Sequence, residues 1–137
     1  MNALEFLSQY SDLLARIREL DCDIQIAEDN LTRVTASYDG DGCSGGDPVD
    51  RRRTKEARLG DLIVKKANLE YLAEQKRQEI WDKIDGLSDY RHRKVLQLHY
   101  CDGRSFAEIG KLLGYCDRSI YYFHRRGMDI MQREMVL

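Results

Sequence analysis

The sequence lacks most of the features that mark membrane, secreted and disulfide-bonded proteins. It contains one proline among 137 residues, and no apolar run is long enough to cross a bilayer. The N-terminus lacks the basic-then-apolar order of a signal peptide. We therefore expect a soluble cytoplasmic protein with no membrane partner. Its four cysteines should then be reduced thiols, namely Cys22, Cys43, Cys101 and Cys116.

Signatures of catalysis and of metal binding are also missing. No nucleophile–base pair, phosphate-binding loop or paired-carboxylate motif is present. The residues His99, Cys101, Cys116 and His124 lack the closely spaced pairs that structural zinc sites use. The sequence predicts a protein that is not an enzyme and that uses no cofactor or metal.

Charge is abundant and unevenly distributed. Charged residues make up 34% of the chain and give a net charge of −2. Residues 1–50 have eleven acidic and three basic side chains, a net charge of −8, whereas residues 51–86 and 87–137 each carry +3. This positive excess is compatible with nucleic-acid binding but is too small to establish it.

Residues 3–35 have the pattern of one long helix. Asn2 can cap it, with Glu5 three residues later as in a capping box. Apolar residues recur at alternating spacings of four and three, at Phe6, Tyr10, Leu13, Ile17, Leu20, Ile24, Ala27, Leu31 and Val34. Such a stripe needs a partner helix, and Leu7 and Leu14 widen it beyond what one partner covers. We expect a homodimer or higher homo-oligomer; the alternative is a monomer whose C-terminal domain covers the stripe.

A second helix follows a glycine-rich segment. Residues 37–47 predict a flexible loop, after which Asp47 can cap a helix that begins with Pro48 and runs to about Asp85. Its apolar stripe, interrupted by Lys66 and Lys76, consists of Leu59, Leu62, Leu69, Ala73, Ile80, Ile84 and Leu87. Residues 1–86 therefore predict a coiled-coil-like helical hairpin that serves as the oligomerisation region.

One basic run stands out in this second helix. Arg51, Arg52 and Arg53 are followed by Lys55 and Arg58. A solvated helix face explains such a run most simply, and binding of phosphates or of an acidic partner is the alternative.

Residues 87–137 predict a helix-turn-helix domain, which makes the whole chain all-α. A first helix spans Asp89 to Tyr100, and Ser105 with Glu108 forms a capping box for a second. Gly114 can end that helix in a left-handed conformation, and a longer helix starts near Asp117. The residues expected to face inward are Phe106, Ile109, Leu112 and Leu113, then Ile120, Phe123, Gly127, Ile130 and Met131.

The last helix retains an outer face that is suited to duplex DNA. The N-terminal half of such a helix normally meets base edges in the major groove. The expected base-facing residues are Asp117, Arg118, Tyr121 and Tyr122. The expected phosphate-binding residues are Lys94, Arg104, Lys111, Arg125 and Arg126.

The segment DGRSFAEIGKLLGYCDRSIYYFHRRGMDIM resembles the region-4 helix-turn-helix of bacterial sigma factors. It looks more closely like small phage proteins described as sigma-like or late-gene regulators. The match covers about residues 85–131. It implies a phage-encoded protein acting in the bacterial host cytoplasm, with RNA polymerase as a further partner. No segment resembles the sigma region that melts promoters, so the chain is not a complete sigma factor.

Three residues depart from that family pattern. Gly110 stands where alanine is usual, which weakens the helix by about 1 kcal/mol. Cys116 replaces a serine cap, so Asp117 is expected to take over capping. Tyr122 occupies a position that is usually basic.

These observations together favour a sequence-specific regulator of transcription that binds double-stranded DNA. Two other classes remain open. A terminase small subunit also combines helical oligomerisation with a helix-turn-helix. A protein-directed inhibitor or adaptor would use the acidic first helix instead of the C-terminal domain.

Overall fold

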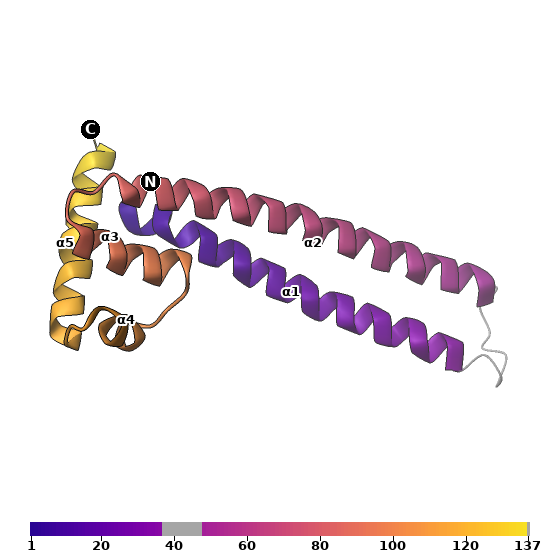
Figure 1. The fold of residues 1–137 in the computed structure, drawn as a ribbon. Coiled ribbons are helices and arrows are strands. Elements are labelled where there is room, and N and C mark those ends of the chain that lie inside the picture. Colours follow the sequence, from indigo (N-terminus) through magenta and orange to yellow (C-terminus); the bar gives the residue numbers. More distant parts are fainter. Residues whose placement is uncertain (37–47, 137) are drawn as a thin grey trace. The chain divides into compact units, whose positions relative to one another are not determined.

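The computed structural model describes residues 1–36 and 48–136. Every regular element in these residues is a helix, which confirms the predicted all-α class (Figure 1). The elements are α1 (Ala3–Ala36), α2 (Pro48–Asp85), α3 (Tyr90–Leu96), a π-helical turn η2 (Gln97–Cys101), α4 (Phe106–Leu113) and α5 (Asp117–Val136). None of the described helices is long and apolar enough to span a membrane. The predicted loop at 37–47 and its Asp47 cap lie outside the described residues.

The beginning of α1 follows from its first residues. The side-chain oxygen of Asn2 accepts a hydrogen bond from the Glu5 backbone N–H at 2.8 Å, and the Glu5 carboxylate accepts from the Asn2 N–H at 3.3 Å. Each side chain satisfies a donor that the helix would leave unpaired. The predicted cap of α1 is confirmed.

Contacts along the chain divide it into two compact units. Unit 1 contains residues 1–14 and 72–137, and unit 2 contains residues 15–71. This division differs from the predicted boundary after residue 86, since both ends of the predicted hairpin belong to unit 1. The assignment of residues 1–86 to oligomerisation and of 87–137 to DNA binding stays a prediction.

The core of unit 1 explains why it joins distant parts of the sequence. Its buried residues come from the first turns of α1, the last turns of α2 and the C-terminal segment: Ala3, Phe6, Leu7, Ile80, Ile84, Leu87, Leu96, Cys101 and Met131. Leu7 is completely buried there, so it does not need a second chain to cover it. The side-chain oxygen of Gln132 also accepts a hydrogen bond from the Ala3 N–H at 2.7 Å, which fixes the start of α1 against α5.

Arg77 of α2 makes a polar connection within the same unit. Its guanidinium group donates to the backbone oxygen of Cys101 at 3.3 Å and to the carboxylate of Asp102 at 2.8 Å. It also lies 5.5 Å from the centre of the Trp81 ring. Burial raises the pKa of the Cys101 thiol to about 11, so this cysteine stays protonated at neutral pH.

Unit 2 contains the remaining parts of α1 and α2. Ile17, Leu20 and Leu69 are its buried apolar residues. The Lys66 ammonium group, which interrupts the apolar stripe, pairs with the Asp21 carboxylate of α1 and lies 3.6 Å from that of Glu70. Lys66 therefore contributes an ion pair where the heptad pattern would place an apolar side chain.

The predicted helical segment from Asp89 to Tyr100 is confirmed in its extent, but the type of helix changes after Leu96. The carboxylate of Asp89 caps α3, which ends at Leu96 and continues as the π-helical turn η2. In η2 the Asp102 N–H donates to the Gln97 oxygen at 3.2 Å, five residues back. Apolar periodicity does not reveal such an insertion, because the added residue is accommodated by contacts with neighbouring elements.

Candidate nucleic-acid interface

The segment between α4 and α5 is fixed by local hydrogen bonds. The Ser105 hydroxyl oxygen accepts from the Glu108 N–H at 3.2 Å, as predicted. The Glu108 carboxylate lies instead toward Arg104, at 3.8 Å from its guanidinium group. Gly114 ends α4 with φ of 78° and donates its N–H to the Gly110 oxygen at 2.9 Å. The predicted left-handed end of α4 is confirmed.

Gly110 is required by this turn. The Tyr115 N–H donates to the Gly110 oxygen at 3.0 Å, which folds the chain back over α4. A β-carbon on Gly110 would lie 2.8 Å from the backbone oxygen of Tyr115, closer than such atoms can approach. The glycine therefore permits a tight backbone approach, and the expectation that it only weakens the helix was incomplete.

The first residue of α5 also differs from expectation. The helix begins at Asp117, and the Ile120 N–H donates to the Cys116 oxygen at 3.1 Å. Cys116 thus occupies the capping position, and the prediction that Asp117 takes it was wrong. The Cys116 sulfur lies 3.4 Å from the Ser119 hydroxyl. This hydrogen bond lowers the pKa of the exposed thiol.

The two faces of α5 separate as the spacing predicts. Ile120, Phe123, Gly127 and Met131 are buried, and Ile130 is half-buried. The four predicted base-facing residues are all exposed, at Asp117, Arg118, Tyr121 and Tyr122. The Asp117 carboxylate, however, turns toward Gly110 of α4, beside the buried Ile120. More than half of the surface of each tyrosine is accessible, 57% and 58%. Their exposure leaves these side chains available to a partner.

Gly127 lets α5 and α3 cross closely. A β-carbon on this glycine would lie 3.0 Å from the Cδ1 atom of Leu96 and 3.4 Å from the Cβ atom of His92. Leu96 is itself completely buried, so it has little room to move. The small residue therefore sets the distance between the two helices.

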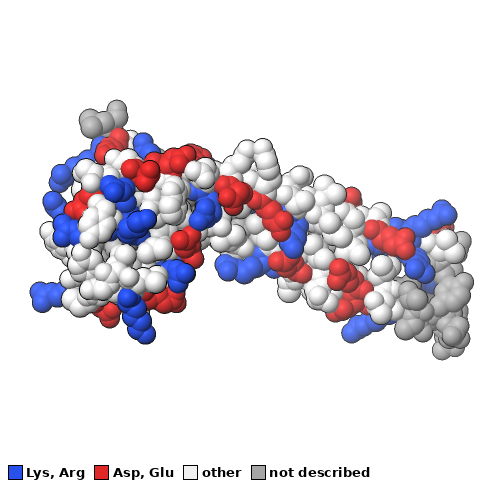
Figure 2. Space-filling model, viewed as in Figure 1, with Lys and Arg blue, Asp and Glu red and all other residues white. Residues whose placement is uncertain are grey.

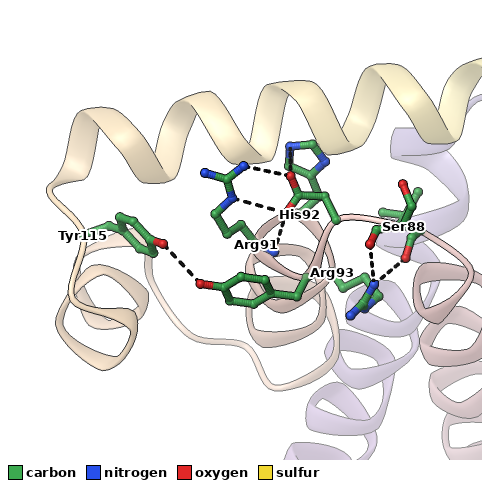
Figure 3. Close-up of polar contacts among 8 residues, drawn as sticks. Ser88, Arg91, His92, Arg93 and Tyr115 are labelled. Carbon is green, nitrogen blue, oxygen red and sulfur yellow. Dashed lines mark hydrogen bonds and ion pairs between the residues drawn. The ribbon is translucent and has the colours of Figure 1, made fainter.

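An ion pair at the start of α3 supports the buried face of α5. The Arg91 guanidinium donates to both oxygens of the Asp89 carboxylate, at 3.2 and 3.0 Å, and lies 5.0 Å from the centre of the Phe123 ring. His92 points toward α5 beside it (Figure 3). The hydrogen bonds from Arg91 lower the pKa of Asp89 to about 2. Asp89 therefore remains charged at all ordinary pH values.

Five rings connect η2 and α4 with the outer part of α5. The His99 ring stacks on Phe106 at 4.3 Å between centres, and Phe106 lies 4.8 Å from Tyr121. The Tyr100 hydroxyl is 2.8 Å from the Nε2 atom of His124. Burial, with a smaller contribution from nearby His99, lowers the pKa of His124, so its ring is neutral at pH 7. This packing orients Tyr121 at one edge of the outer face.

The five expected phosphate-binding residues are exposed, at Lys94, Arg104, Lys111, Arg125 and Arg126. They come from α3, the segment before α4, α4 itself and α5. Figure 2 shows Lys and Arg side chains spread over this part of the molecule, with Asp and Glu between them. On the face shown, the surface is therefore mixed in sign.

Two exposed residues of this region were missed by sequence reasoning. Leu112 was expected in the core but is 56% exposed, because the inner face of α4 consists of Phe106, Ile109, Gly110 and Leu113. Counting Gly110 as an inner position would have revealed the i, i+3, i+4, i+7 pattern that excludes Leu112. Tyr90 is 54% exposed, and its hydroxyl lies 3.3 Å from that of Tyr115. No local pattern predicts that pair.

Within residues 1–36 and 48–136, no group of three or more His, Cys, Asp or Glu side chains could hold a metal ion. The cysteines described there, Cys22, Cys101 and Cys116, are free. Comparison with family models, with curated proteins and with solved structures found no significant match to this chain.

Proposed function

We propose that this protein binds duplex DNA in a sequence-specific manner and regulates transcription. In this proposal α4 and α5 form a helix-turn-helix, and α5 lies in the major groove. The observation that carries it is the division of α5 into a buried face and an exposed one. Ile120 and Phe123 anchor the helix, while Arg118, Tyr121 and Tyr122 are left accessible at its N-terminal half.

The exposed side chains suit different parts of a duplex. The Arg118 guanidinium can donate two hydrogen bonds to O6 and N7 of a guanine. Tyr121 and Tyr122 offer ring surfaces to thymine methyl groups and hydroxyls to phosphates. Arg125 and Arg126 lie further along α5 and are better suited to the backbone, since arginine binds phosphate oxygens in bidentate fashion.

We further propose that α1 and α2 form a hairpin through which the protein self-associates. Support comes from exposed apolar side chains of α2: Ile63 is 49% exposed, Val64 60% and Leu72 49%. The sequence suggested a second copy because of Leu7, which is buried within the chain. These exposed residues of α2 now support that expectation instead. A dimer would present two DNA-binding helices to a two-fold symmetric site. Light scattering measures the number of copies, and a ring of many subunits would favour a terminase-like role.

Two substitutions on α5 test the assignment of DNA contacts. Arg118→Ala should reduce the preference for a selected site over a scrambled one by about 5-fold to 150-fold, because it removes a base contact worth about 1–3 kcal/mol. Arg125→Ala should weaken binding to both duplexes equally, because phosphates are the same in every sequence.

The sites would be selected from randomised duplexes, and affinities measured for both variants at one salt concentration. Lys83→Ala, which removes an exposed cation from α2, provides the control. Equal losses on matched and scrambled DNA for Arg118→Ala would contradict its role in base recognition.

A further inference from the structure

The first turns of α2 contain a concentration of positive charge that the α5 surface does not include. Five of the eight residues from 51 to 58 are basic and one is acidic. We call these residues, Arg51, Arg52, Arg53, Lys55 and Arg58, the basic cluster. The four arginines are exposed and Lys55 is half-buried. Figure 2 shows Lys and Arg gathered over the beginning of α2, beside a smaller group of acidic side chains.

Within residues 1–36 and 48–136, ion pairing neutralises one of the five cations. Arg52 pairs with Glu56 of the same helix at 3.0 Å. Among the described residues, no carboxylate lies within ion-pairing distance of the other four cations, whereas Lys66 of the same helix pairs with Asp21 of α1. The basic cluster is therefore not held by α1 as Lys66 is.

The position of the cluster in its helix is electrostatically unfavourable. The N-terminus of a helix carries partial positive charge, so cations placed near it are mildly destabilising, most of all in the first turn. Arg51, Arg52 and Arg53 all lie in the first two turns of α2. A stabilising role inside the folded chain is hard to reconcile with that placement, whereas a bound anion would offset both sources of positive charge.

The chemistry of the cluster fits nucleic acid better than protein. Residues 51–58 contain one apolar side chain, that of Ala57. Protein–protein interfaces depend on buried aromatic and aliphatic side chains at their centre, whereas nucleic-acid interfaces are polar and strongly positive. Consecutive arginines project about 100° apart around a helix, so they reach several phosphates rather than one.

Two members of the basic cluster face an open groove between α1 and α2. Lys55 and Arg58 line an open groove of about 220 Å³ together with Ile26, Ala27 and the side chain of Asn30 from α1. Asp23 and Leu62 complete that lining, so one carboxylate faces the two cations. The α1 helix therefore leaves Lys55 and Arg58 accessible to solvent at this point.

We infer that the basic cluster binds phosphates of duplex DNA and forms a second backbone contact, separate from the α5 surface. The inference rests on the proposed function. It assigns DNA binding to residues that lie outside the α5 surface. The cluster contributes affinity and not sequence preference, because phosphates carry no sequence information. Each phosphate contact releases counterions, so the logarithm of the affinity falls more steeply with the logarithm of salt concentration.

The test compares two variants with the same change in charge. Arg51→Gln, Arg53→Gln and Arg58→Gln are combined in the cluster variant. Arg16→Gln, Arg18→Gln and Lys65→Gln are combined in the control, since these exposed cations lie on α1 and α2 outside the cluster. Binding to the selected and the scrambled duplex is measured by fluorescence anisotropy over a range of salt concentrations, and folding is followed by circular dichroism.

The measured quantity is the slope of the logarithm of the affinity against the logarithm of the salt concentration. We expect this slope to be smaller in magnitude for the cluster variant than for the control by about 2–3, at about 0.9 for each lost phosphate contact. The ratio of affinities for the two duplexes should stay unchanged. If the triple variant does not fold, Arg53→Gln alone should lower the slope by about 0.9.

Other outcomes separate the two proposals. Equal slopes in both variants overturn the inference, and they leave the α5 proposal intact if Arg118→Ala still changes sequence preference. The inference is also overturned if the two variants have equal salt slopes and only the cluster variant unfolds at a lower temperature. That result would mean that the cluster stabilises the folded chain itself. Binding to polyglutamate rather than to duplex, lost only in the cluster variant, assigns the cluster to an acidic protein. A wild-type chain that binds no duplex at low salt overturns both proposals.

Discussion

The described parts of residues 15–71 and residues 72–136 are both mainly helical, but their interiors differ. Among the described residues, the first stretch buries three apolar side chains, Ile17, Leu20 and Leu69. The second buries many more, and it adds close backbone approaches at Gly110 and Gly127. A narrow stripe tolerates small changes, whereas a densely packed interior does not. Equal substitutions should therefore have unequal effects in the two regions.

The largest difference is expected for loss of a buried isoleucine. Ile120→Ala should lower the free energy of unfolding by about 2–5 kcal/mol, because Ile120 is completely buried beside Phe123. Ile24→Ala, the matched change at a half-buried position of α1, should cost about 1 kcal/mol. Urea unfolding of both variants measures the contrast, and equal losses would show that the two interiors are packed alike.

Two glycine substitutions should differ in sign. Gly110→Ala should destabilise the protein by about 1–3 kcal/mol, because the new β-carbon meets the Tyr115 oxygen at 2.8 Å. Gly60→Ala should stabilise it by up to about 1 kcal/mol, because nothing lies within 4 Å of the added atom and alanine favours a helix. Thermal unfolding of both variants measures the two changes in stability. A stabilising effect of Gly110→Ala would show that the turn after α4 can relax to accept the β-carbon.

The smallest effect concerns acid stability. The pKa of Asp89 is lowered to about 2 by hydrogen bonds from Arg91. Because the pKa is depressed in the folded state, its contribution to stability is full above the ordinary value near 4 and disappears as pH falls toward 2. Asp89→Asn keeps a capping side chain but removes the charge. Its destabilisation relative to wild type should therefore shrink between pH 5 and pH 2; a constant difference would contradict the role of the charge.

Local features were predictable from the sequence, and distant contacts were not. Asn2, Ser105 and Gly114 act on residues within a few positions, so their capping roles follow from the sequence alone. Leu7 belongs to a core shared with α2 and α5, which a stripe on one helix cannot reveal. The role of Gly110 likewise depends on where Tyr115 returns.

The same limit applies to the candidate interface. Periodicity placed the outer face of α5 correctly because one helix has one buried side, here that of Ile120 and Phe123. It placed Leu112 wrongly because α4 is only eight residues long, and a short helix permits several choices of inner face. The end of α3 at Leu96 and the turn η2 depend on contacts such as that of Arg77 with Asp102. Those contacts join residues that are far apart in the sequence.

The core of unit 1 limits how this protein can be cut into pieces. A fragment starting at residue 87 would lack Ile80, Ile84 and the hydrogen bond from Arg77 to Asp102. It would also expose Leu96 and Met131 to water. The smallest piece that preserves this interior takes both ends of the chain, residues 1–14 and 72–137, rejoined by a short artificial turn. An engineered miniature of this protein would therefore begin by deleting the middle of the sequence.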